Sequence, residues 1–187
     1  LRARIALFPY HLPLRRLLIE QLREDGPHAT EPAIHELLAI EPGDAWAMRE
    51  LALVLSELGR FDEALAQCAN ATAREPHEPS CHSIRGRVLI LAARHTEAAE
   101  ACREAIRLSI DHSYAISTLL ECCHDNVARK EALAFILGEL ERQVVLGDGL
   151  LGYVRTAYPL LEPAELLANI RAAHAARPDL WHAWSAL

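Results

Sequence analysis

The segment from Glu41 to Pro76 decides the fold, and it reads EPGDAWAMRELALVLSELGRFDEALAQCANATAREP. Its first half carries the i, i+3, i+4, i+7 stripe of an amphipathic helix at Met48, Leu51, Ala52 and Leu55. Residues 59–62 break that pattern, and the Asp62 carboxylate is the expected N-cap of a second helix. Pro76 ends the second helix, because proline lacks the N–H group that a helix interior needs. The segment therefore predicts a hairpin of two helices.

The pattern recurs with a period of 34 residues along the chain. One apolar column at this spacing runs through Ile34, Cys68, Cys102, Ile136 and Ile170. A second column, with one charged member, contains Leu17, Leu51, Arg85, Leu119, Tyr153 and Leu187. A third column stays small or apolar at Leu18, Ala52, Gly86, Leu120 and Val154. Several columns in one register indicate an internal repeat.

This register predicts repeats at residues 11–44, 45–78, 79–112, 113–146 and 147–180. Residues 1–10 then form the tail of a preceding helix, and residues 181–187 begin a further repeat. Each hairpin cannot bury its own apolar faces, so stacked neighbours are expected to share one continuous core.

The register resembles the tetratricopeptide repeat family over nearly the whole chain. The residues that carry the resemblance lie mainly between 45 and 112: Leu51, Ala52, Leu55, Gly59, Phe61, Ala64, Ala71, Pro76, Gly86, Leu89, Ala98 and Ala105. The resemblance implies an all-α solenoid, a right-handed superhelix of antiparallel helix–turn–helix hairpins. It also implies a concave groove that is lined by the first helix of each hairpin. The first, fourth and fifth repeats match less well, so irregular geometry is expected there.

Composition and charge exclude several classes of partner. The chain has 187 residues, of which 51% are hydrophobic, and a formal net charge of −7. Proteins that bind nucleic acids or anionic membrane surfaces usually carry a basic excess, so neither is expected as a partner. No apolar run reaches 18 residues, which predicts no transmembrane helix. The odd number of cysteines, five, argues against a disulfide framework and favours a cytoplasmic location.

The groove that the resemblance implies would be lined by residues that suit an acidic partner. Nine residues are predicted to contact a partner: Arg15, Arg16, Trp46, Arg49, Leu53, Arg87, Tyr114, Glu121 and Arg155. Guanidinium groups bind carboxylates in a bidentate way, and aromatic rings offer flat apolar anchors. We therefore expect a protein or peptide with an acidic or carboxylate-ended segment, bound near Arg49 and Arg87. The alternative is a solvated face whose arginines pair with neighbouring glutamates.

Residues 147–152 spell G-x-G-x-x-G after the apolar run at 144–146. This is a dinucleotide-binding fingerprint only where it joins a strand to a helix within a βαβ unit. Its flanks here are helical, so a helix-breaking loop is expected and no cofactor.

Two histidine and cysteine clusters raise the question of a metal, one at residues 122–125 and one at His77, Cys81 and His82. Neither has the second ligand pair of a zinc site. Cys123 shares a core column with Leu55 and Leu89, and His82 lies in an apolar column, so core roles are expected and no metal. The sequence contains no G-x-S-x-G, H-E-x-x-H or Walker motif, and this segment is not expected to be an enzyme.

Two alternatives to a binding module stay open. One is that the chain is the non-catalytic repeat region of a larger enzyme, such as a glycosyltransferase or peptidase, whose catalytic domain lies outside these residues. Self-association through the terminal repeats, which include Trp181 and Trp184, is the other. The first is motivated by the lack of an obvious polar capping helix, which solenoids usually need, and the second by the terminal repeats, which could stack between copies.

Overall fold

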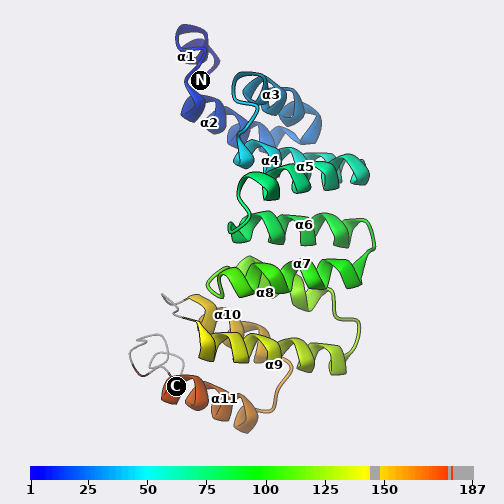
Figure 1. The fold of residues 1–187 in the computed structure, drawn as a ribbon, viewed down its shortest axis with the longest axis vertical. Coiled ribbons are helices and arrows are strands. Elements are labelled where there is room, and N and C mark those ends of the chain that lie inside the picture. Colours follow the sequence, from blue (N-terminus) through cyan, green and yellow to red (C-terminus); the bar gives the residue numbers. More distant parts are fainter. Residues whose placement is uncertain (144–147, 177, 179–187) are drawn as a thin grey trace. The chain divides into compact units, whose positions relative to one another are not determined.

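The computed structural model describes residues 1–143, 148–176 and 178, and these form an all-α helical repeat (Figure 1). The described residues contain eleven α-helices, one 3-10 helix and no strands. The all-α repeat fold predicted from the sequence is therefore confirmed. Among these helices, none combines the length and the apolar character needed to cross a bilayer.

The chain divides into two compact units, Leu1–Pro76 and His77–Leu187. The N-terminal unit contains α1 Arg2–Leu7, α2 Leu12–Leu22, the 3-10 helix η1 Arg23–Asp25, α3 Pro27–Ile40, α4 Ala45–Glu57 and α5 Phe61–Arg74. Helix α3 packs against both α2 and α4, and α4 packs against α5. The core of this unit is built on fully buried side chains that include Ile19, Ile34, Leu37 and Leu51.

The turn between α4 and α5 explains why the second helix starts earlier than predicted. Gly59 has a φ of 74°, and the Arg60 N–H donates to the Leu55 carbonyl, which closes a Schellman-type turn. This turn delivers the chain directly to Phe61, the first residue of α5. The prediction that Asp62 caps α5 is therefore wrong, because Asp62 lies inside the first turn. Its carboxylate still interacts favourably there with the helix dipole.

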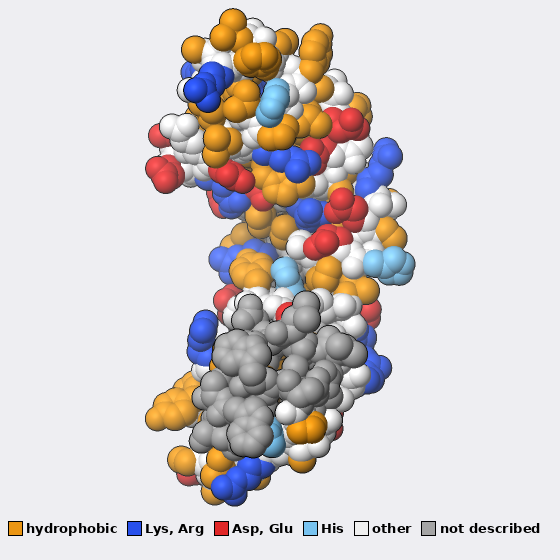
Figure 2. All heavy atoms as spheres, turned by 90° about the vertical axis from the view of Figure 1, so that its left-hand side faces the viewer, with side chains coloured by type: hydrophobic (Ala, Val, Ile, Leu, Met, Phe, Trp, Pro, Cys, Tyr) orange, Lys and Arg blue, Asp and Glu red, His pale blue; other side chains and the backbone are white. Residues whose placement is uncertain are grey.

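Helix α2 is rotated relative to the prediction. Ile19 is fully buried, whereas Leu17, predicted to lie in a repeated apolar column, is 51% exposed. Helix α1 has only six residues, and it leaves the side of α2 that carries Leu17 uncovered. Leu7, Phe8 and Tyr10 are exposed as well, and Figure 2 shows apolar side chains gathered at this end of the N-terminal unit.

The C-terminal unit contains three further hairpins. Their helices are α6 Pro79–Leu91, α7 His95–Leu108, α8 Ser113–Glu121, α9 Asn126–Arg142, α10 Asp148–Ala157 and α11 Pro163–Ala176. Helix α8 packs between α6 and α10, and α9 packs between α7 and α11, so first and second helices form two layers. A shared core of buried side chains, including Ile106, Ile116, Leu119 and Ile136, joins the layers.

Glycines allow close approach between elements of this unit. A Cβ atom at Gly86 on α6 would lie 2.6 Å from Cys102 Sγ on α7. A Cβ atom at Gly149 would lie 2.8 Å from the Ile110 carbonyl oxygen. Gly149 and Gly152 are inside α10, so the prediction of a helix-breaking loop is wrong for this part of residues 147–152. Packing against Ile110, which excludes a side chain, accounts for Gly149 within a helix.

Some predictions concern residues outside the described ranges. These are the apolar run and glycine at residues 144–147, and the terminal positions Trp181, Trp184 and Leu187. The division into repeat frames stays a prediction.

A buried polar contact links the first helices of two hairpins. His112 Nε2, at the start of α8, lies 2.8 Å from Ser83 Oγ on α6. Burial lowers the pKa of His112 below its ordinary value of 6.5, although the charge of Glu78 acts in the opposite direction. His112 therefore resists protonation in the folded protein.

We predict that Gly86→Ala destabilises the protein by about 1–3 kcal/mol, because the added Cβ would overlap Cys102 Sγ. Gly138→Ala in α9 is the matched control, since nothing lies within 4 Å of its Cβ position. Helix propensity alone should make that variant more stable by roughly 0.5–1 kcal/mol. Urea unfolding monitored by circular dichroism would measure both. Adding Cys102→Ala should relieve the Gly86→Ala penalty; equal losses with and without it would contradict the overlap.

The second prediction concerns pH. Because the pKa of His112 is lower in the folded protein, the unfolded chain binds more protons below pH of about 6.5. This contribution to stability is complete above that pH and is lost as the pH falls towards the folded-state pKa. The free-energy difference between wild type and His112→Gln should therefore shrink between about pH 7.5 and about pH 5.5. Urea titrations at both pH values would test this, and a constant difference would exclude it.

Candidate partner-binding surface

The arginines of the N-terminal unit that were predicted to contact a partner are all ion-paired. Arg15 Nη1 lies 3.0 Å from Glu36 Oε2, and Arg16 Nη2 lies 2.8 Å from Asp44 Oδ2. Arg49 pairs with Glu75. A fourth pair, Arg23 with Glu50, was not among the nine predicted residues. The predicted residues are therefore exposed to solvent only in part.

Burial divides these four pairs into two kinds. The guanidinium is the buried partner in Arg15–Glu36, at 12% against 65% exposed, and in Arg49–Glu75, at 12% against 47%. The carboxylate is the buried partner in Arg16–Asp44, at 43% against 2%, and in Arg23–Glu50, at 41% against 12%. Arg16 and Arg23 therefore present positive groups to solvent, whereas Arg15 and Arg49 present their carboxylate partners.

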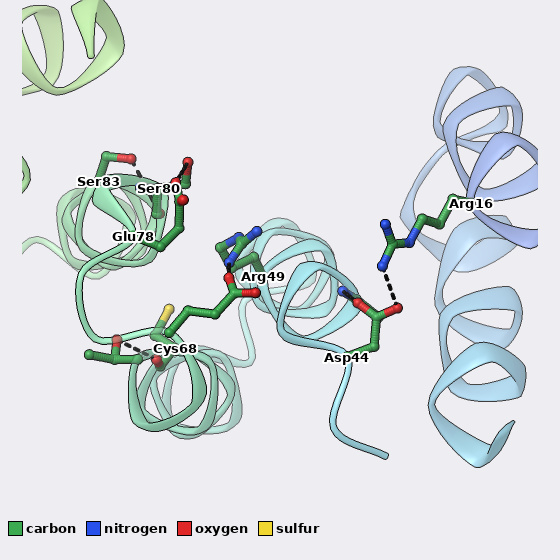
Figure 3. Close-up of polar contacts among 10 residues, drawn as sticks. Arg16, Asp44, Arg49, Cys68, Glu78, Ser80 and Ser83 are labelled. Carbon is green, nitrogen blue, oxygen red and sulfur yellow. Dashed lines mark hydrogen bonds and ion pairs between the residues drawn. The ribbon is translucent and has the colours of Figure 1, made fainter. Parts of the chain in front are cut away.

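Arg16 is held from two sides. Its Nη2 donates to Asp44, as Figure 3 shows, and its guanidinium carbon lies 5.1 Å from the centre of the Trp46 ring. Asp44 is itself fixed, because its Oδ1 accepts a hydrogen bond of 3.0 Å from the Ala47 N–H and caps α4. Arg16 and Trp46, two of the predicted residues, are thus brought together on α2 and α4.

The electrostatics around Glu50 follow from the same arrangement. Burial raises the pKa of this carboxyl, the charges of Arg23 and Arg49 lower it, and the charge of Glu20 raises it further. The net shift is upward. Glu20 is an exposed residue of α2. Glu20 is four residues after Arg16 and three before Arg23, so it lies on the same side of α2 as these two arginines.

Three predicted residues of the C-terminal unit lie together. Arg87 Nη1 on α6 donates to Glu121 Oε2 on α8 over 3.1 Å. The charges of both groups act on Tyr114, whose pKa is raised mainly by burial. Tyr114 is nevertheless 44% exposed and presents ring surface to solvent. The two remaining predicted residues are Arg155, exposed in the last turn of α10, and Leu53, half-buried on α4.

The cysteines lie within the core. All five are free and buried, which agrees with the core position predicted for Cys123. A hydrogen bond with Cys122, together with burial, raises the pKa of the Cys102 thiol, so this thiol is protonated at neutral pH. In the described part of the chain, no group of three histidine, cysteine or acidic side chains is placed to hold a metal ion.

Sequence periodicity did not find the capping and ion-pairing roles of Asp44. Asp44 precedes the helical stripe of α4, so the pattern of an N-cap before an apolar run could have identified its capping role. Its pairing with Arg16, 28 residues earlier, is a tertiary contact that carries no local signal.

We predict that Asp44→Ala destabilises the protein more than Asp125→Ala does. Asp125 caps α9 through the Ala128 N–H but is exposed, so its loss should cost about 1 kcal/mol. Loss of Asp44 removes a buried cap and also the partner of Arg16, for a total of about 2–3 kcal/mol. Asp44→Asn keeps a capping oxygen, so its loss of stability should lie between the losses of Asp125→Ala and Asp44→Ala. Denaturant unfolding of the three variants would test the order; equal losses for the two alanine variants would show that the Arg16 pair contributes nothing.

Comparison with known proteins gives one family and several similar folds. The tetratricopeptide repeat family model matches residues 21–88. The O-GlcNAc transferase of Thermobaculum terrenum, solved as a mutant, is 25% identical over 70% of this chain, with a TM-score of 0.60. This chain spans only 26% of that transferase. A comparison with curated protein sequences finds no match.

Two more distant structures share the fold alone. YrrB, described as a TPR protein with an unusual peptide-binding site, is 16% identical with a TM-score of 0.56. The alignment covers 99% of this chain and 96% of YrrB. PilF of Pseudomonas aeruginosa is 14% identical with a TM-score of 0.62, and the alignment covers 98% of this chain and 84% of PilF. The family match over residues 21–88 and the helical hairpins agree with the repeat register read from the sequence, and this part of the chain is similar to the tetratricopeptide repeat family.

Proposed function

We propose that this chain is a protein-interaction or scaffolding module that binds a segment of a partner protein on the first helices of its hairpins. The observation that carries this proposal is the exposure of aromatic and guanidinium groups on those helices. Tyr114 on α8 is 44% exposed, and Arg16 on α2 and Arg23 directly after α2 present their charged groups to solvent. Aromatic rings and arginines are the side chains most often found at the energetic centres of interfaces. The peptide-binding site named for YrrB is consistent with this use of the fold.

The partner is an acidic or carboxylate-ended segment, and the nine predicted residues are its proposed contacts. In the C-terminal unit, Arg87 pairs with Glu121, which is 52% exposed and can swing into solvent when a partner carboxylate arrives. Arg49 would similarly exchange Glu75 for a partner carboxylate. These exchanges conserve the number of ion pairs, so they give orientation and specificity more than affinity.

A second candidate function is favoured by one comparison. The similar segment of the Thermobaculum terrenum transferase belongs to a much larger protein, of which this chain spans 26%. This chain would then be the non-catalytic repeat region of a larger enzyme, and its hairpins would hold the protein substrate of that enzyme. An antibody raised against residues 1–143 would distinguish the two candidates on an immunoblot of the native cells. A band near 20.8 kDa supports the separate module, and a much larger band supports the enzyme region.

We predict that a photo-crosslinker on the first helix of a hairpin captures partner proteins and that one on the second helix does not. Benzoylphenylalanine would replace Leu53 on α4 or Tyr114 on α8. The matched controls replace Ala66 on α5 or Ala134 on α9, both of which are exposed. After irradiation in native lysate, mass spectrometry should find crosslinks from the first-helix positions only, and mainly to acidic segments. Equal capture from the control positions would reject this placement of the partner.

A further inference from the structure

The exposed charges of α2 form an ordered stripe. Arg16 and Arg23 are seven residues apart, which is two helical turns and about 10 Å along the axis. Glu20 lies four residues after Arg16 and three before Arg23, so all three side chains share one face. The backbone of Arg23 keeps helical dihedral angles, with φ of −61° and ψ of −30°, so the stripe does not turn away at the end of α2.

The two arginines of the stripe are anchored before any partner binds. Each guanidinium has a buried carboxylate of α4 or its N-cap behind it, Asp44 for Arg16 and Glu50 for Arg23. Trp46 packs against Arg16 in addition, and Arg16 Nε is buried without a hydrogen-bond partner. The outer edge of each guanidinium stays open. A long side chain that is already ordered loses less conformational entropy on binding, so these two groups are preorganised for an anion.

Glu20 determines which anion fits. A uniformly acidic segment would place a negative charge opposite Glu20, and like charges at close range are unfavourable. A segment with a cation between two carboxylates would instead satisfy all three members of the stripe. The stripe therefore selects by the order of charges as well as by their sign.

We propose that Arg16, Glu20 and Arg23 form a docking stripe for a partner segment that carries acid, base and acid at the matching spacing. This inference rests on the proposed function, because it names the kind of segment that the module binds. It assigns the first contact to Arg16 and Arg23 in the N-terminal unit. Arg49, whose side chain is 12% exposed beside Glu75, is not part of the stripe.

The test uses two alanine-based fluorescein peptides of equal length and the full chain. One peptide carries Glu, Lys and Glu at positions i, i+4 and i+7, and the other carries Lys, Glu and Lys. Fluorescence anisotropy should show binding of the Glu-Lys-Glu peptide and at least severalfold weaker binding of the charge-reversed Lys-Glu-Lys peptide. The indole N–H resonance of Trp46, assigned with Trp46→Phe, should shift during the titration because the ring lies under Arg16.

Variants locate the site. Arg16→Gln with Arg23→Gln should raise the Kd for the Glu-Lys-Glu peptide about fivefold, as expected for two partly exposed ion pairs. Arg107→Gln with Arg142→Gln is the matched control for charge, since both are exposed arginines of the C-terminal unit, and it should leave the Kd unchanged.

Glu20→Lys keeps the proposal testable if the arginine variants unfold, because Glu20 is exposed and takes no part in the ion pairs of this surface. This variant should weaken binding of the Glu-Lys-Glu peptide and strengthen binding of a Glu-Glu-Glu peptide. If the stripe had only a structural role, Glu20→Lys would not change which of the two peptides binds more tightly.

Three outcomes would overturn the docking stripe: no binding of the Glu-Lys-Glu peptide, equal binding of the reversed peptide, or a Kd that the arginine and Glu20 variants do not change. Each is independent of the photo-crosslinking result. Crosslinks from Leu53 or Tyr114 positions together with any of these outcomes would leave the interaction module standing and reject only the stripe. If the first-helix positions give no crosslinks and the Glu-Lys-Glu peptide does not bind, the proposed function is rejected as well.

Discussion

A hairpin of two amphipathic helices cannot bury both of its apolar faces, and the architecture of each unit depends on that constraint. The column that repeats every 34 residues is where the constraint is met. Ile34, Cys68, Cys102, Ile136 and Ile170 are at most 4% exposed. Burial of each isoleucine contributes about 1.5–3 kcal/mol, so this one column is a substantial share of the core. The same constraint demands close approach of paired helices, which is why Gly86 faces Cys102 without a side chain between them.

The period predicts the fold because burial in a repeat array is local and regular. Leu51, Leu119 and Tyr153, which belong to one predicted column, are buried as expected. Arg85, the charged member of that column, is exposed. The register fails where a neighbour is missing or a turn intervenes. Leu17 is uncovered because α1 is short, and Asp62 loses its capping role because the turn at Gly59 closes sooner. Both departures depend on what packs next to a residue, which a period does not encode.

The candidate site was predictable to a smaller extent. Periodicity assigned Arg15, Arg16 and Arg49 to one side of their helices, and the structure places carboxylates beside all three. The solvated, ion-paired face that the sequence left as an alternative therefore describes much of this surface. In each ion pair, the partner that is less buried is the one that reaches solvent. Asp44 is buried because it caps α4. The guanidinium of Arg16, which pairs with it, therefore lies on the solvent side of the pair.

This dependence on depth changes how a chain with a net charge of −7 can recognise an acidic partner. Long-range attraction cannot help, because this net charge has the same sign as the partner, and because salt screens interactions between exposed charges that are more than about 8–10 Å apart. Recognition must then act at contact, through the order of exposed charges and through aromatic surface such as that of Tyr114. A carboxylate that is buried behind a guanidinium serves two purposes in such a surface. It neutralises the arginine in the free protein, which limits non-specific binding of anions, and it fixes the guanidinium in the orientation that a matching segment can use.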